Sequence, residues 1–183
     1  MAHAGQSIAN PVTGERVVFR STAADSGGAL LSMDYFAPAH HVIAPTHVHP
    51  RQEERSEVLA GRLHGHIGGD KRTVEVGEVA VVAPAVHHAW RSAGDGELHM
   101  LVDFRPALAT ETVLEVLWGL ARAGRTNKRG MPSPLQMAVL MRDHLDETCA
   151  PVIPMVAQRA LVGGMAAIGR RRGYRSVYPE LLG

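Results

Sequence analysis

Residues 45–61, PTHVHPRQEERSEVLAG, carry two histidines and two glutamates, His47, His49, Glu53 and Glu54, inside eight positions. Histidine and glutamate are seldom buried in a protein core without a partner, so this density calls for a functional explanation. His47 and His49 lie two residues apart, so on a β-strand both side chains project to the same face. Imidazole nitrogens suit zinc, iron, copper and nickel, and an added carboxylate extends the range to manganese. The stretch therefore predicts a mononuclear metal site.

Turn signals on both sides of this stretch divide residues 16–105 into about eight short strands. Apart from the central stretch, strands are expected at residues 16–22, 29–37, 62–67, 72–76, 79–83, 87–92 and 97–104. The first two are expected to form a hairpin. Short strands spaced by roughly 8–12 residues are typical of a β-sandwich or β-barrel.

The pattern changes after Pro106, where apolar residues recur at helical spacing. Helices are expected at residues 107–123, 134–147 and 154–172, the second opening with Ser133 followed by Pro134. We therefore expect a mainly β chain in three parts: an N-terminal arm at 1–15, a β-domain at 16–106 and a helical extension at 107–183.

Composition limits the possible partners. The chain has 183 residues, enough for one domain with an appendage, and 19 Lys plus Arg balance 18 Asp plus Glu. That balance argues against a nucleic-acid partner, which needs a basic excess. Cys149 is the single cysteine, so a disulfide framework is excluded and a reducing compartment is expected. The first residues lack the pattern of a signal peptide, and no apolar stretch reaches the roughly 18 residues of a membrane span. We expect a cytoplasmic protein without a membrane partner.

A second histidine cluster lies in residues 77–90, GEVAVVAPAVHHAW. Together the two stretches resemble the motifs of the cupin superfamily. In the first motif His47-Val-His49 is followed by four residues, Glu54, six residues and Gly61, and in the second His88 stands eleven positions after Gly77. The intervening residues 62–76 have the length that the superfamily usually shows. The resemblance covers about residues 16–105 and implies a double-stranded β-helix, or jelly-roll, barrel.

The resemblance also implies the metal ligands, which are His47, His49, Glu54 and His88. Two positions depart from the superfamily pattern without removing a ligand. A glycine of the second-motif turn is Ala85 here, which would be strained if the turn requires positive φ. An asparagine four residues after the ligand histidine is Ser92 here, a change that affects at most a hydrogen bond at the strand end.

Neighbouring residues leave two ligand choices open. Glu53 and Glu54 point to opposite faces of a strand, and the spacing to Gly61 favours Glu54, although a bulge after Pro50 would reverse the choice. His87 is likewise the second choice to His88. Trp90 shares the face of His88, so Trp90 and Met100 are the candidates for a substrate pocket. The remaining candidates are more typical of surface positions or of a solvated sheet face: His40, His41, His64, His66 and His99.

A metal held by three imidazoles and one carboxylate keeps coordination positions open, as in catalytic sites. Our leading hypothesis is a metal-dependent enzyme with dioxygenase-like chemistry on a small organic molecule, in which Glu54 is both a ligand and a proton acceptor. The alternatives are a non-catalytic small-molecule-binding cupin and a sugar isomerase or epimerase. Neither the substrate nor the metal, whether Fe, Mn, Ni, Zn or Cu, follows from the sequence. The apolar residues of the helical extension exceed what one barrel can cover, so a homodimer is expected.

Overall fold

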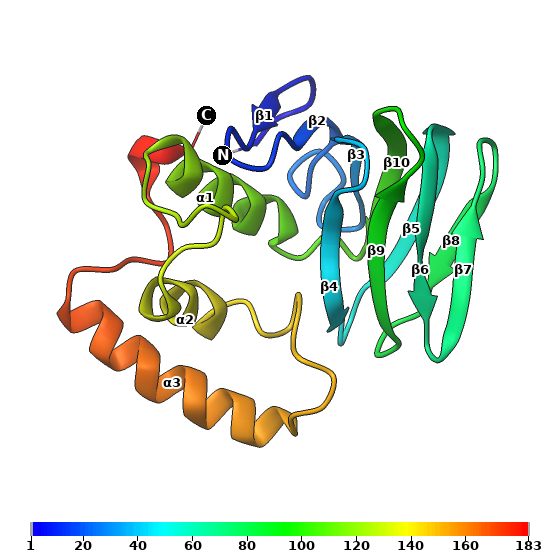
Figure 1. The fold of residues 1–183 in the computed structure, drawn as a ribbon. Coiled ribbons are helices and arrows are strands. Elements are labelled where there is room, and N and C mark those ends of the chain that lie inside the picture. The colour runs from blue at the N-terminus through cyan, green and yellow to red at the C-terminus, as the bar shows by residue number, and fades with distance from the viewer. Residues whose placement is uncertain (1, 183) are drawn as a thin grey trace.

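The computed structural model describes residues 2–182 and shows two antiparallel sheets followed by helices (Figure 1). The larger sheet has the order β1 (Ser7–Ala9), β2 (Arg16–Ser21), β3 (Leu31–Ala37), β10 (Leu98–Arg105), β5 (Glu53–Ala60) and β8 (Val79–Val82). The smaller sheet has the order β4 (Val42–Val48), β9 (His87–Ala93), β6 (Arg62–Ile67) and β7 (Asp70–Val74). This arrangement confirms the mainly β fold class.

Alternating burial along the strands builds the core. In β5 every second residue is buried, and Val58 is fully enclosed. The largest side chains with no exposed surface in the sheets are Phe19, Leu31, Leu63 and Leu98. Removing each of them from water contributes about 1.5–3 kcal/mol to folding. The expected hairpin forms between β2 and β3, and the segment expected to be an arm supplies β1, which pairs with β2.

Three helices follow the last strand: α1 (Thr110–Arg122), α2 (Pro134–Arg142) and α3 (Met155–Arg171), with a short 3-10 helix at Pro179–Leu181. The expected start of α2 is correct, because Ser133 Oγ accepts a hydrogen bond from the Gln136 amide at 3.3 Å. Within residues 2–182, none of the helices combines the length and apolar character needed to cross a bilayer.

The expected end of α2 at residue 147 is wrong, because the helix stops at Arg142. The chain then runs back to the smaller sheet, where Cys149 and Val48 exchange two backbone hydrogen bonds of 2.9 and 3.0 Å. This tertiary pairing satisfies backbone groups that a longer helix would have used. It also attaches the helical extension to β4, the strand that carries His47.

Gly65 on β6 allows a close approach that no other residue would permit. A Cβ at this position would lie 1.9 Å from the carbonyl oxygen of Ala89 and 2.5 Å from the Trp90 ring. Gly65 is paired in register with Trp90 on the neighbouring strand β9. Because glycine has no side chain, the Trp90 indole has room to lie over β6. Trp90 in turn contacts Glu54, so this glycine supports the interior of the barrel.

We expect Gly65→Ala to lower the free energy of unfolding by about 1–3 kcal/mol, because β6 and Trp90 must shift to admit the methyl group. Urea denaturation monitored by circular dichroism measures the change. Gly69→Ala is the matched control, since a Cβ there meets nothing within 4 Å. Equal effects of the two substitutions would contradict this account.

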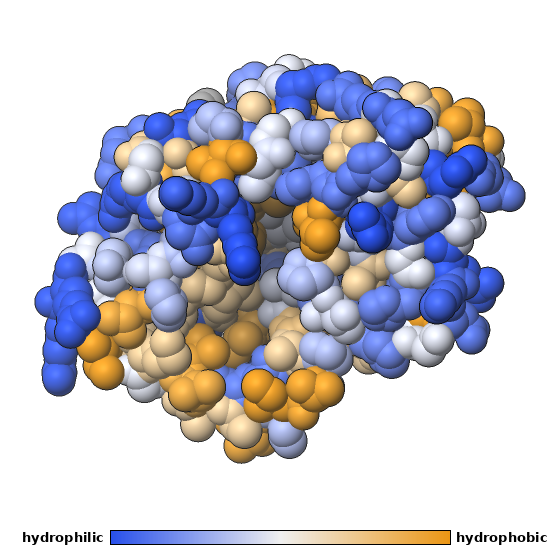
Figure 2. All heavy atoms as spheres, in the orientation of Figure 1, coloured by the Kyte–Doolittle hydropathy of each residue, from blue (hydrophilic) through white to orange (hydrophobic). Residues whose placement is uncertain are grey.

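The expected homodimer stays a prediction, and the outer face of α3 is the surface that we expect it to use. Val156, Leu161 and Ile168 are 82%, 59% and 49% exposed. Figure 2 shows apolar residues gathered along the lower edge of the molecule, in the region of α3. Large contiguous apolar patches on soluble proteins often mark interaction sites, so this face is our candidate for the dimer interface.

Sedimentation velocity at micromolar concentration should therefore report a dimer, and Leu161→Glu combined with Ile168→Glu should shift it to a monomer. Val79→Glu combined with Val81→Glu is the control, because these valines are also half-exposed but lie on β8. A monomer for the unmodified chain would contradict the expectation.

Candidate metal centre

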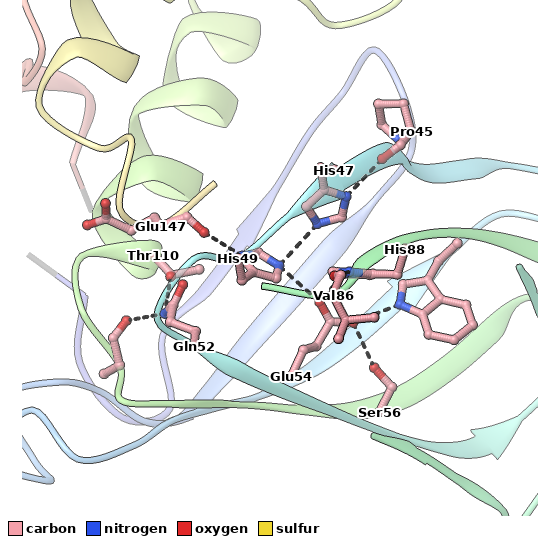
Figure 3. Close-up of polar contacts among 12 residues, drawn as sticks. Pro45, His47, His49, Gln52, Glu54, Ser56, Val86, His88, Thr110 and Glu147 are labelled. Atoms are coloured by element: carbon pink, nitrogen blue, oxygen red, sulfur yellow. Dashed lines mark hydrogen bonds and ion pairs between the residues drawn. The ribbon is translucent and has the colours of Figure 1, made fainter. Parts of the chain in front are cut away.

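The four predicted ligands come from both sheets and meet between them (Figure 3). His47 near the end of β4 is paired in register with His88 at the start of β9. Glu54 reaches the same point from β5 of the larger sheet, and His49 lies in the connection between β4 and β5. One donor atom from each side chain lies within 4.8 Å of all the others.

The donor atoms lie close together. His47 Nε2 is 3.1 Å from His49 Nε2, and Glu54 Oε2 is 3.2 Å from the Nε2 atoms of both His49 and His88. His49, Glu54 and His88 are buried, with 7%, 5% and 0% of their surfaces exposed, whereas His47 is partly exposed. The cluster is thus enclosed by the two sheets around His49, Glu54 and His88, and solvent reaches it mainly at His47.

Backbone carbonyls fix the tautomers of all three imidazoles. His47 Nδ1 donates to the Pro45 carbonyl at 2.8 Å, and His88 Nδ1 donates to the Val86 carbonyl at 3.1 Å. His49 Nδ1 donates to the Glu147 carbonyl. A carbonyl oxygen can only accept, so each Nδ1 carries a hydrogen, and the neutral ring then presents a bare Nε2 lone pair.

Three bare Nε2 atoms and one carboxylate oxygen therefore face one another without a hydrogen atom between them when the rings are neutral. Acceptors at 3.1–3.2 Å repel one another unless a cation lies among them. Outer hydrogen bonds that hold imidazole Nδ1 are the usual supports of metal-bound histidine. The residues present fit a divalent metal ion by number, donor type and supporting contacts.

Without a metal, protons take its place. Burial would raise the pKa of Glu54, but hydrogen bonds from His49 and His88 hold it well below its usual range. Burial would lower the pKa of His88, but the bond to Glu54 raises it. Burial, together with the neighbouring His88 and His49, lowers the pKa of His47 to about 4. A proton on His88 Nε2 thus competes with a metal for the Glu54 carboxylate.

Trp90 and Met100, the expected pocket residues, both line the cavity next to the cluster. Trp90 does more than line it, because its Nε1 donates to Glu54 Oε1 at 2.8 Å. Ser56 Oγ donates to the same oxygen at 3.3 Å. These bonds fix Oε1 and leave Oε2 to the histidines. The spacing of residues placed Trp90 on the correct face, but it gave no sign of this hydrogen bond.

Glu147 supports the candidate site in a way that the sequence did not indicate, because it contacts His49 through its backbone carbonyl. Its carboxylate is also anchored, accepting from the Ala109 amide at 3.2 Å and from His144 Nδ1 at 3.3 Å. The segment after α2 is thereby held against His49. A pairing of imidazole with a backbone oxygen 98 positions later has no sequence signature.

The turn before β9 supports His49 from the other side. Ala85, at a position that is glycine in the superfamily pattern, has φ +65° and is therefore left-handed, which costs alanine roughly 1–2 kcal/mol. The Ala85 amide donates to the His49 carbonyl at 2.8 Å.

Ser92, the other position that departs from the superfamily pattern, accepts from the His41 amide at 2.8 Å and donates to the Pro38 carbonyl.

The alternative ligands lie outside the cluster. Glu53 is only partly buried while Glu54 is enclosed, and His87 is exposed while His88 is not. His99 lies on Phe36 and contacts Asp34 at 2.7 Å. The other histidines named from the sequence take no part in the cluster found among residues 2–182: His40, His41, His64 and His66.

Comparisons with known proteins show one matching family profile and several similar solved structures. The profile of a family described as Cupin domain matches residues 36–104, which include all four clustered side chains. An RmlC-like cupin from Shewanella frigidimarina is 18% identical, covering 61% of this chain and 94% of its own, with a TM-score of 0.49. A predicted oxalate decarboxylase from Thermotoga maritima is 18% identical, covering 56% and 92%, with a TM-score of 0.49. KdgF from Halomonas sp. is 17% identical, covering 51% and 79%, with a TM-score of 0.45. No curated protein sequence matches the chain.

Metal binding should release a proton at neutral pH. Because the pKa of His88 is raised, its ring stays protonated to a higher pH than an ordinary histidine, whose pKa is about 6.5. A metal that binds His88 must displace that proton. His47, with a pKa of about 4, is already neutral and releases none. The apparent affinity for Mn²⁺ should therefore fall as pH decreases, and should level off only above the pKa of His88.

Isothermal titration calorimetry in buffers of different ionisation enthalpy counts the released protons directly. We expect the count at pH 6.5 to exceed the count at pH 8.5. His87→Gln is the control, because His87 is exposed and should leave the count unchanged. An affinity independent of pH between 6 and 8 would contradict the assignment.

Proposed function

Residues 36–104 are a cupin domain, and from this premise we propose that the chain is a metal-dependent enzyme with dioxygenase-like chemistry on a small organic molecule. The observation that carries the proposal is the cluster of acceptors. Three imidazole Nε2 atoms and Glu54 Oε2 converge, and the tautomers leave no hydrogen to separate them when the rings are neutral. A divalent cation satisfies all four atoms at once.

The position of the cavity supports a catalytic ion over a structural one. His47, His49 and Glu54 line an apolar cavity of about 340 Å³, while His88 closes the opposite side and is fully buried. Four protein ligands leave coordination positions open on an ion that prefers more, and these positions would face the cavity. A structural site would instead be enclosed by its ligands.

Bound there, a redox-active ion would supply activation of O₂ and a Lewis acid for an enolate or phenolate. The residues around it would orient the substrate and exclude water. Trp90 and Ser56 hold Glu54 Oε1, so the carboxylate keeps one orientation during turnover. For Glu54 to accept a substrate proton, as proposed, one of these bonds or the contact of Oε2 with a histidine must open.

Two alternatives remain as outcomes of the test. A non-catalytic binding cupin would use the same cavity without turnover. A sugar isomerase or epimerase finds less support, since a sugar needs hydrogen-bonding groups around its hydroxyls and this cavity is lined mainly by apolar side chains.

Elemental analysis of the purified protein, followed by oxygen-electrode assays with phenols, diketones and thiols, tests the proposal. We expect one equivalent of a redox metal and substrate-dependent oxygen uptake. Glu54→Gln should weaken metal binding on the order of 100-fold, because the remaining donor atoms are neutral. Glu53→Gln is the matched control, since its neighbouring carboxylate lies outside the cluster.

Tight metal binding without turnover of any compound would favour the binding cupin. Equal loss of metal in the Glu53 and Glu54 variants would contradict the ligand assignment.

A further inference from the structure

The cavity beside the cluster is formed jointly by the barrel and the helical extension. Strands contribute Tyr35, Trp90 and Phe104, while α1 contributes Leu117 and α2 contributes Met137. Figure 2 shows the face of the molecule hollowed between these two parts. The volume of about 340 Å³ is at the lower end of the range for ligand sites and equals the share of about eleven liquid waters.

Charge is missing from the wall away from the cluster. Among the described residues that line the cavity there is no lysine, arginine or aspartate, and Glu54 is the one glutamate. A second anionic or cationic group on a ligand would therefore be buried without a partner. Burying an unpaired charge is strongly unfavourable, and an unpaired hydroxyl or amide costs roughly 1–3 kcal/mol.

The polar atoms of the wall are also largely engaged. Tyr35 Oη donates to Glu15, and Trp90 Nε1 donates to Glu54. Thr110 Oγ1 accepts from Gln52 Nε2 at 2.8 Å. Thr148 lines both this cavity and a second one of about 260 Å³ that also borders His47, so it lies where the two adjoin. Apart from the hydroxyls of Thr110 and Thr148, the polar groups available for recognition are those at the end of the cavity that holds the candidate metal ligands.

The apolar part of the wall is rich in methionine. Five of the eight methionines in the chain line this cavity: Met33, Met100, Met131, Met137 and Met141. Thioethers are polarisable, make favourable contacts with aromatic rings, and adapt their shape to a ligand. With Phe104 and Trp90 they form a wall suited to a flat, polarisable ring system.

We propose that the cavity binds an aromatic molecule with a single phenol-type oxygen, which points to the metal while the rings lie among the methionines. The cavity discriminates against dicarboxylates, sugars and phosphate esters. This assignment of substrate class rests on the proposed function for the anchoring of the oxygen, but its apolar part rests on the wall alone.

Calorimetric titration of the full chain loaded with Mn²⁺ tests the class with four probes: 2-naphthol, 6-hydroxy-2-naphthoate, oxalate and glucose. We expect 2-naphthol to bind at least 30-fold more tightly than 6-hydroxy-2-naphthoate, which has the same rings with a carboxylate at the far end. Oxalate and glucose should bind more weakly still. A preference for oxalate, glucose or the carboxylate probe, or no binding of 2-naphthol, would overturn the proposal.

Two variants locate the binding. Met137→Lys should weaken the binding of 2-naphthol at least 10-fold. It should also reduce the ratio of the affinities for 2-naphthol and 6-hydroxy-2-naphthoate, because the new ammonium can pair with the carboxylate. Met137→Leu keeps the wall apolar and should change 2-naphthol affinity less than threefold, and thermal melting checks that both variants fold. An unchanged probe ratio in folded Met137→Lys would overturn the proposal.

A separate titration of Mn²⁺ into the protein distinguishes the two proposals. If the chain binds 2-naphthol but takes up no Mn²⁺, the result would contradict the proposed function and support the apolar ligand class. If the chain takes up Mn²⁺ but prefers oxalate or glucose, the result would contradict the proposed ligand class and support the metal site.

Discussion

The convergence of three imidazole Nε2 atoms and one carboxylate oxygen on one point is the constraint on which the rest of the structure depends. Such a set of acceptors needs a metal ion or a proton among its atoms, and it presents Nε2 to a metal only if each ring keeps its Nδ1 hydrogen outside the cluster. The carbonyls of Pro45, Val86 and Glu147 provide that restriction, and they belong to three separate parts of the chain. Both sheets and the helical extension must therefore be in place before the site exists.

Much of the surrounding sequence can be understood from this requirement. Gly65 gives Trp90 the room it needs, and Trp90 fixes one oxygen of Glu54. Ala85 keeps a left-handed turn, whose amide holds the His49 backbone. The strain at Ala85 is small compared with the loss of a buried ligand, so the fold tolerates alanine there.

The sequence predicted the parts of the molecule that repeat or alternate. Strand alternation separated Glu54 from Glu53, and motif spacing brought His88 to the same point as His47, although these lie 41 positions apart (88 minus 47). What could not be predicted depends on backbone groups or on long-range pairing. The Glu147 carbonyl has no side-chain signal, and α2 ends early because residues near Cys149 pair with Val48. The hydrogen bond from Trp90 to Glu54 likewise required the facing sheet.

The bond between His49 and the Glu147 carbonyl would link the lifetime of a bound ion to the state of the cavity. The same segment follows α2, whose Met137 and Met141 line the cavity. Opening this side of the cavity would disturb the hydrogen bond that supports His49, and a ligand in the cavity would keep that bond in place. Dissociation of the ion and of the ligand would then require movement of the same segment, so a ligand in the cavity should slow the loss of metal to a chelator. If the site holds an ion, the helical extension would therefore slow exchange of the ion as well as form a wall of the cavity.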